Sequence, residues 1–305
     1  MKKVLIIGAS SCLGSNLATY LRRHYLVYGT YAHHRPKIED VPCFQMHLDD
    51  ETPILGVLKT LRPDTVIYCA GITDTQLCDR DSDLAFAINA TYPGTIASAL
   101  GRFGSRMIYL SSAKVFSGSK GNYVENDFPD PQDIYGSSKR RGEEILARYQ
   151  NVFILRLPTI FALGSLNQRS MLNRLLRQLW RGEEISCISD ETRTFVSSRD
   201  LCQAIGLLID ADPIHEGIYH LGSQHSDTYY GFATRLARIF GLPAKLVNPV
   251  SGASFHGKAV QRRHHDLSLG LGELRKVFGF EPEKPDQALQ RLQLGLKQGS
   301  FVPIP

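Results

Sequence analysis

Short apolar runs alternate with longer amphipathic segments through the first half of the chain. A short apolar run between turn residues predicts a buried strand, and apolar residues three and four apart predict a helix. The predicted strands cover Lys3–Ile7, Tyr25–Tyr31, Asp64–Ala70, Arg106–Ser111 and Val152–Leu157. The predicted helices between them cover Leu13–His24, Thr52–Leu61, Asp81–Phe103 and Tyr135–Tyr149. This order predicts an α/β fold built on a doubly wound parallel sheet.

The alternation breaks after Pro158. The pattern then predicts one short strand, Gly217–Leu221, and four helices, Leu172–Arg181, Arg199–Asp210, Tyr230–Phe240 and Leu269–Phe278. No linker rich in proline, glycine or serine separates the two halves, so we expect them to interleave. We predict a Rossmann-type dinucleotide-binding domain over residues 1–157, rejoined by residues of about 192–225. A smaller C-terminal substrate-binding lobe is expected over residues 158–191 and 226–305.

The composition is that of an ordinary globular protein, with 43% hydrophobic and 21% charged residues among 305. The net charge of +5 is scattered, so the sequence does not predict binding to a nucleic acid polymer. The apolar run after Met1 stops at Gly8, short of the ~7–15 residues of a signal peptide. No run reaches the ~18 apolar residues of a membrane span. We therefore expect a cytoplasmic protein that does not bind a membrane.

The cysteines and histidines do not form a metal motif. The six cysteines lack CxxC spacing, and the ten histidines lack an HExxH pattern. We expect free thiols in a reducing compartment and no metal site.

The segment Gly8–Gly14 lies between the first predicted strand and the first predicted helix. A pyrophosphate binds backbone N–H groups at a helix N-terminus, next to glycines that allow a tight turn and a close approach. Ser11 replaces the middle glycine, and a plain small-residue turn is the alternative. The strand–turn–helix context favours a dinucleotide. The expected cofactor contacts here are Gly8, Ser10, Ser11, Cys12, Leu13 and Gly14.

The end of the second strand bears on the choice of cofactor. An acid there would bind the ribose of NAD, but the segment from Gly29 to Arg35 contains none. His33 and Arg35 suit a 2′-phosphate, so NADP(H) is the expected cofactor and NAD the second choice. A solvated basic loop is the alternative. After the third strand, Cys69, Ala70 and Gly71 allow a ribose to lie close to the backbone, although a plain turn fits them equally well.

Tyr135 and Lys139 share one face of a predicted helix, four residues apart. A nearby cation favours the phenolate, which makes Tyr135 a plausible proton donor to a carbonyl. Ser112 follows a strand and can polarise that carbonyl. Alone, the spacing is common on exposed helices and the serine is an ordinary cap. The three residues in this order, after a dinucleotide turn, favour a catalytic role.

These motifs resemble an extended short-chain dehydrogenase/reductase of the NAD-dependent epimerase/dehydratase superfamily, closest to the dTDP-4-dehydrorhamnose reductase branch. The segments that carry the resemblance are Gly8–Gly14, Pro63–Ile67, Thr73, Asn89–Thr91, Ser111–Gly118, Tyr135–Lys139, Gly142–Glu143 and Ile154–Arg156. The resemblance implies that Ser112, Tyr135 and Lys139 are catalytic and that Asn89 supports the site. It also implies cofactor contacts at Leu48, Pro158 and Ile160.

Several positions depart from the pattern of that branch. His47 stands in place of an acid near the adenine, and His264 replaces a late proline. Ala113 and Lys114 replace an Asp-Tyr pair. These changes leave the chemistry intact and the exact substrate open. Candidate substrate contacts are Thr73, Ser112, Arg193 and Arg263, the two arginines being suited to a diphosphate.

The resemblance implies reduction of the 4-keto group of a nucleotide-linked deoxysugar with NADP(H). A 4,6-dehydratase needs an Asp-Glu pair where this chain has Ala113 and Lys114. An epimerase with tightly bound NAD usually carries the missing second-strand acid. The regulatory subunit of methionine adenosyltransferase resembles the same branch and offers a role in binding alone. The retained trio argues for turnover, on a small-molecule partner, and the sequence is compatible with a homodimer.

Overall fold

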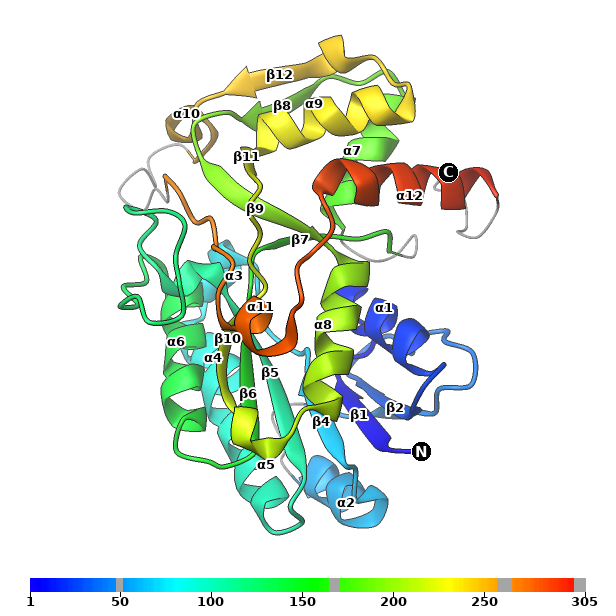
Figure 1. Cartoon of the computed structure of the whole chain (residues 1–305), viewed down its shortest axis with the longest axis vertical. Helices are drawn as coiled ribbons and strands as arrows, with labels where there is room; N and C mark the ends of the chain where they lie inside the picture. The colour runs from blue at the N-terminus through cyan, green and yellow to red at the C-terminus, as the bar shows by residue number, and fades with distance from the viewer. Residues whose placement is uncertain (48–51, 165–169, 257–264, 299–305) are drawn as a thin grey trace.

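The computed structural model describes residues 1–47, 52–164, 170–256 and 265–298. At its centre lies a seven-stranded sheet in which each strand runs parallel to its neighbours (Figure 1). In spatial order the strands are β10 (Gly217–His220), β6 (Val152–Leu157), β5 (Arg106–Ser112), β4 (Thr65–Tyr68), β1 (Lys3–Ile7), β2 (Leu26–Tyr31) and β3 (Cys43–Gln45). The strand order reverses between β1 and β4. Open sheets of this kind bind ligands at the carboxyl ends of the strands beside that point.

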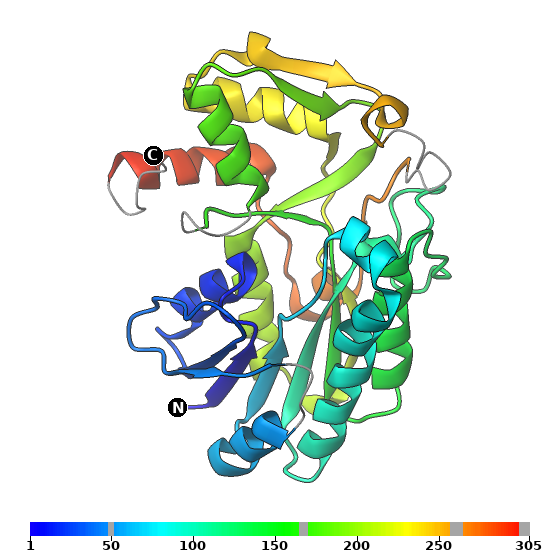
Figure 2. The same cartoon turned by 180° about the vertical axis from the view of Figure 1, so that it is seen from behind.

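Helices cover both faces of this sheet (Figures 1 and 2). The helices of one face are α1 (Cys12–Leu21) and α8 (Ser198–Asp210). Those of the other face are α2 (Thr52–Leu61), α5 (Tyr92–Gly101) and α6 (Ile134–Leu146). The α/β doubly wound class predicted from the alternation of elements is therefore confirmed.

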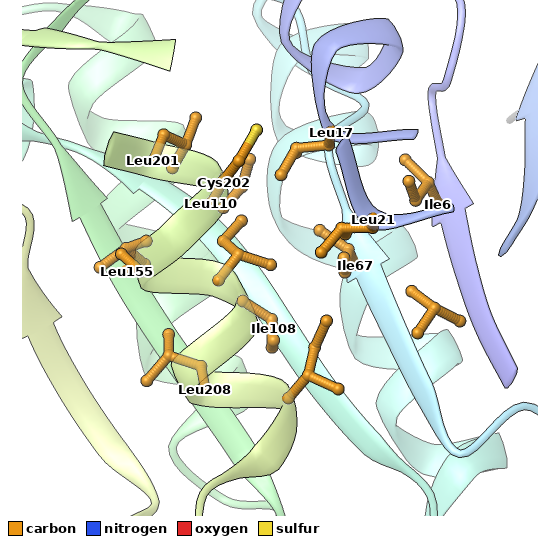
Figure 3. Close-up of a cluster of buried hydrophobic side chains, with 14 of the residues drawn as sticks. Ile6, Leu17, Leu21, Ile67, Ile108, Leu110, Leu155, Leu201, Cys202 and Leu208 are labelled. Carbon is orange, nitrogen blue, oxygen red and sulfur yellow. The ribbon is translucent and has the colours of Figure 1, made fainter. Parts of the chain in front are cut away.

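Successive side chains of β1 point into two separate cores, because side chains alternate along a strand. Ile6 belongs to the same buried cluster as Leu17 of α1 and Leu208 of α8 (Figure 3). Its neighbour Ile7 packs in the other cluster with Ile96 of α5. All five of these side chains are buried. A strand buried on both faces explains why its sequence is an unbroken apolar run.

The second half of the chain adds two small sheets and a third core. The three-stranded sheet has the order β11 (Ser226–Thr228), β9 (Thr192–Ser197) and β7 (Thr159–Phe161), and β12 (Val247–Val250) pairs with β8 (Ile185–Ile188). The third core lies among these strands and three helices, α7 (Met171–Trp180), α9 (Tyr229–Phe240) and α12 (Pro285–Lys297). The shorter elements are α3 (Thr75–Arg80), α4 (Ser82–Phe86), α10 (Gly252–His256), α11 (Glu273–Phe278) and the 3₁₀ turns η2 (Ala113–Val115), η3 (Pro213–His215) and η4 (Ala244–Leu246).

The second half also returns to the large sheet. β10 pairs with β6 at its edge, and α8 packs in the core shared with α1. This distribution supports the predicted interleaving of a large domain with a smaller lobe, although the exact division stays a prediction.

The predicted helix Asp81–Phe103 is wrong as one continuous element. Between α4 and α5 the chain makes a π-helical turn, η1 (Ala87–Thr91). Pro93 has no N–H to donate to the carbonyl of Asn89, four residues earlier. The hydroxyl of Tyr109 donates to that carbonyl instead, at 2.5 Å. The carbonyl of Asn89 therefore has a hydrogen-bond partner in a side chain of β5.

The other differences lie in the second half. The predicted helix Leu269–Phe278 begins only at Glu273. The N–H of Leu269 donates to Thr194 Oγ1 at 3.0 Å, and its carbonyl accepts from the N–H of Ser223 at 3.1 Å. These bonds tie Leu269 to neighbouring segments in place of a helix. The pattern also missed α12 and the short strands β3, β7, β8, β9, β11 and β12.

A buried ion pair fixes α6 to β6. Arg156 donates from Nε to Glu143 Oε1 at 2.9 Å and from Nη2 to Oε2 at 2.8 Å, and each side chain is only 1% exposed. Ser111, at the end of β5, donates its hydroxyl to the same Oε1 at 2.6 Å. Bidentate pairs of this kind fix geometry as well as charge.

His220 of β10 completes this network. Its Nδ1 lies 3.1 Å from the carbonyl of Tyr123, and its Nε2 lies 3.2 Å from Arg156 Nη1. A guanidinium only donates, so Nε2 accepts and Nδ1 carries the proton. Burial, and then the charge of Arg156, lower the pKa of His220 to about 3. The imidazole is therefore neutral and joins β10 to β6 without a charge of its own.

Replacing Glu143 by Gln is expected to lower the free energy of unfolding by about 3–5 kcal/mol, because Arg156 stays buried without its counter-charge. Urea denaturation measures this change. Glu144→Gln is the matched control, since Glu144 is 41% exposed and pairs at the surface with Arg140 and Arg141. The control should cost less than about 1 kcal/mol. Equal losses in the two variants would contradict this role of Glu143.

Candidate active site

The turn between β1 and α1 lies against the end of β4. Gly8 has φ of +87°, and a Cβ there would lie 2.8 Å from the backbone nitrogen of Ala70. A Cβ on Gly14 would overlap the carbonyl oxygen of Gly8. Both positions therefore require glycine, for backbone conformation at the first and close packing at the second. The turn has the tight geometry that the sequence predicted for a pyrophosphate cradle.

Ser11 caps α1. Its hydroxyl accepts from the N–H of Gly14 at 3.0 Å, with φ of −69° and ψ of 161°. Because φ is negative, a side chain fits where the fingerprint has its middle glycine. Ser10 precedes this cap, and Cys12 and Leu13 form the first turn of α1. N–H groups of a first helical turn bind anions, so the cradle fits a pyrophosphate despite the missing glycine.

The end of β2 presents exposed basic side chains. His33 and Arg35 are exposed, and the ring of His47 lies 5.5 Å from that of His33. The nearby acid Glu39 is bound to Arg22, with 2.8 Å between Nη2 and Oε2. The basic segment is thus available for an anionic group. The predicted contact Leu48 lies outside the described residues.

The end of β4 connects the cofactor turn to the catalytic residues. Cys69 and Ala70 are partly buried, and Gly71 is exposed. A Cβ on Gly71 would lie 3.0 Å from Asn89 Oδ1 and 3.5 Å from Lys139 Nζ. The predicted cofactor strand end therefore adjoins the predicted catalytic lysine.

Ser112 and Tyr135 meet through their hydroxyls. Ser112 is the last residue of β5, and Tyr135 is the second residue of α6. Burial raises the pKa of Tyr135 to about 12, and its hydrogen bond with Ser112 opposes that increase. The phenol is therefore protonated at neutral pH and has a proton to donate.

Lys139 lies one turn further along α6 and is 4% exposed. Its Nζ donates to the carbonyl of Leu110 at 2.8 Å and lies 4.6 Å from the centre of the Tyr109 ring. Burial lowers the pKa of Lys139 to about 8. The amine remains mostly protonated at neutral pH, because its pKa is still above 7.

Asn89 joins three segments of the site. Its amide donates to the carbonyl of Ile72 at 3.0 Å and to Ser138 Oγ at 2.9 Å. Its Oδ1 accepts from the N–H of Ile72 at 3.1 Å. The π-helical turn orients Asn89 so that it holds the end of β4 against α6, in line with the predicted supporting role.

A cavity of about 220 Å³ connects the cofactor turn with the catalytic hydroxyls. It is lined by Cys12, Leu13, Ser111, Ser112, Tyr135, Leu157, Pro158, Ile160, Ala162, Ser170 and Met171. Six of these residues were predicted cofactor or catalytic positions. Ala162, Ser170 and Met171 were not predicted, because they lie in the second half of the chain, where no motif marks them.

Of the predicted substrate contacts, Ser112 lines this cavity, whereas Thr73 and Arg193 do not. Thr73 is exposed beyond β4. Arg193 in β9 is buried, and its Nη2 lies 2.7 Å from Glu191 Oε2. Arg263 lies outside the described residues. Their role in substrate binding stays a prediction.

The described residues were compared with the requirements of a metal site and of a membrane span. They contain no group of three or more His, Cys, Asp or Glu side chains placed to hold a metal ion. None of their helices combines the length and apolar character that a membrane span requires. All six cysteines are free thiols.

Comparison with protein families gives one match over nearly the whole chain. The family model described as RmlD substrate binding domain matches residues 1–295. A dTDP-4-dehydrorhamnose reductase of Bacillus anthracis, solved in complex with NADP, is similar in structure with a TM-score of 0.83. It is 25% identical in sequence, and the alignment covers 96% of this chain and 99% of that one.

Two curated relatives have different descriptions. A probable low-salt glycan biosynthesis reductase of Haloferax volcanii is 29% identical, over 88% of this chain and 91% of its own length. Methionine adenosyltransferase 2 subunit beta of Danio rerio is 27% identical, over 82% of this chain and 77% of its own length. The sequence is therefore similar both to reductases and to a subunit of a different enzyme.

Replacing Ser11 tests its role as a helix cap. Ser11→Ala should lower the free energy of unfolding by about 1 kcal/mol, because the N–H of Gly14 loses its acceptor, whereas Ser11→Gly should cost only a few tenths. Urea denaturation of both variants measures the difference. Identical stabilities for Ser11→Ala and the unchanged protein would show that the cap is dispensable.

Proposed function

Because this chain belongs to the RmlD substrate binding domain family and is an extended short-chain dehydrogenase/reductase, we propose that it reduces a carbonyl group with NADP(H). The proposed substrate carbonyl is the 4-keto group of a nucleotide-linked deoxysugar. The observation that carries the proposal is one cavity lined both by the hydrogen-bonded pair Ser112 and Tyr135 and by Cys12 and Leu13 at the start of α1. A small ligand in that cavity would contact both.

Tyr135 and Ser112 have different roles in the proposed reduction. When bound, the nicotinamide ring supplies a hydride to the carbonyl carbon. Tyr135 donates its phenolic proton to the carbonyl oxygen, which converts the carbonyl into an alcohol. Its raised pKa keeps that proton in place at neutral pH until the oxygen becomes basic. Ser112 holds the oxygen by a hydrogen bond and stabilises the charge that develops there.

Lys139 contributes a positive charge from one helical turn beyond Tyr135 on α6. A buried ammonium favours the phenolate that remains after Tyr135 has given up its proton. Because Gly71 has no side chain, Lys139 Nζ lies close to the end of β4, the strand end expected to hold the nicotinamide ribose. We propose that Lys139 also binds that ribose.

The basic end of β2 supports NADP(H) as the preferred cofactor. His33 and Arg35 offer charge-assisted hydrogen bonds to a 2′-phosphate, and no acid stands where NAD would need one. The similar Bacillus anthracis reductase was solved with NADP. NAD remains the second choice of cofactor.

Two other functions remain as alternatives. An epimerase would use the same trio with tightly bound NAD, and the missing second-strand acid counts against it. A regulatory subunit that binds NADP without turnover is favoured by the likeness to methionine adenosyltransferase 2 subunit beta. The intact trio favours an enzyme over this second role. A homodimer and a cytoplasmic location stay predictions.

Tyr135→Phe is expected to reduce kcat by about 10²–10⁴-fold, because it removes the proton donor and little else. NADPH oxidation, followed with a panel of keto-sugar nucleotides, measures the effect. NADPH affinity and the free energy of unfolding should stay near those of the unchanged protein. A variant that turns over at the original rate would move the binding-only function to first place.

Arg35→Asp is expected to weaken NADPH binding by about 1–3 kcal/mol while leaving NADH binding unchanged or tighter. The reason is that Asp repels the 2′-phosphate and accepts from a ribose hydroxyl. Dissociation constants for both cofactors measure it. Lys37→Asp, at an exposed position on the same segment, controls for net charge. Equal or tighter binding of NADH by the unchanged protein would overturn the NADP preference.

A further inference from the structure

The turn that carries Ser112 is clamped to the first turn of α6 by Lys114 and Asp133. Lys114 Nζ lies 2.7 Å from Asp133 Oδ2, and the aspartate side chain is only 7% exposed. The other oxygen of Asp133 accepts from the N–H of Gly136 at 2.7 Å and so caps α6. One carboxylate therefore joins η2 to the helix that carries Tyr135.

The backbones of the two segments also interlock. A Cβ on Gly136 would overlap the carbonyl oxygen of Lys114, so only glycine allows this approach. The N–H of Lys114 donates to Ser112 Oγ at 3.2 Å. Any movement of Lys114 is consequently passed on to the Ser112 hydroxyl.

We propose that Lys114 is a positioning residue for the catalytic tyrosine: its ion pair with Asp133 offsets the negative charge beside Tyr135 and fixes the Ser112 turn against α6. The inference rests on the proposed function only in assigning Tyr135 as the proton donor. It gives a reason for a lysine at the position where the resembling reductases carry a tyrosine. Lys114 acts through Asp133 and Ser112, without contact to the reacting atoms.

The titratable groups that face Tyr135 come from α6 and its cap, η2, α3 and β5. Asp133, the N-cap of α6, acts to raise the pKa of Tyr135, as does the buried Cys78 thiol of α3. The phenol of Tyr109 in β5 also interacts with Tyr135. The cations are Lys139 on α6 and Lys114 on η2, whose Nζ lies 6.0 Å from the Tyr135 ring centre. Without Lys114, the negative charge of Asp133 would act more strongly on the phenol.

This arrangement makes opposite predictions for the two partners. Lys114→Met should raise the pKa of Tyr135, because the phenolate then faces the Asp133 carboxylate without the compensating charge of Lys114. Asp133→Asn should lower it, because Lys114 becomes the unpaired charge, while asparagine still caps α6 as well as aspartate does. The double variant should return close to the original value. Each single shift is expected to be on the order of half to one pH unit.

The phenol is titrated directly in the whole protein carrying 3,5-difluorotyrosine, since fluorination lowers the pKa of a phenol toward neutral pH. The ¹⁹F signal of Tyr135 is identified by its absence from Tyr135→Phe. Lys114→Arg keeps the charge and should restore the original titration. Lys120→Met is the matched control, because Lys120 and Asp127 form a similar 2.6 Å pair elsewhere in the same loop.

Opposite shifts that cancel in the double variant would support the proposal. Shifts in the same direction, no shift, or a shift of equal size in Lys120→Met would overturn it. The ¹⁹F titration needs no substrate, so it tests the role of Lys114 even if the protein reduces no keto-sugar nucleotide. With a substrate in hand, the inflection of the pH–rate profile should move as the ¹⁹F titration does, while KM changes less than kcat.

Discussion

The buried ion pair of Arg156 joins β6 to α6, the helix that carries Tyr135 and Lys139. The guanidinium is buried between β6 and α6, where only a carboxylate in bidentate contact makes its burial tolerable. Glu143 supplies that carboxylate and also accepts from Ser111. Ser111 precedes Ser112, and Glu143 follows Lys139 by one helical turn. The spacing between strand and helix at the level of the catalytic groups is therefore set by one ion pair outside the cavity.

The features that the sequence predicted correctly depend on neighbours along the chain. The turn at Gly8 needs a positive φ, and the spacing of Tyr135 and Lys139 needs one helical turn. Each constraint is local, so a few residues are enough to reveal it. The strands of the large sheet are similarly visible, because burial on both faces requires apolar side chains throughout.

The features that it missed depend on distant partners. The π-helical turn that carries Asn89 was missed because it depends on Tyr109 of β5, which supplies the hydrogen bond that Pro93 cannot. Ser170 and Met171 line the cavity only because the second half of the chain folds back over it. Short strands such as β11 carry polar residues and gain stability from their pairing with β9. None of these contacts leaves a pattern along the sequence.

The position of β10 has a consequence for synthesis on the ribosome. β10 covers the edge of β6, with Gly217 opposite Phe153, yet it follows β6 by roughly sixty residues. At about 5–20 residues per second, the nascent chain exposes that edge for several seconds before its partner emerges. An apolar edge strand is open to pairing with other chains. Because of the interleaved order of the chain, the large sheet stays incomplete at this edge until the second half has been synthesised.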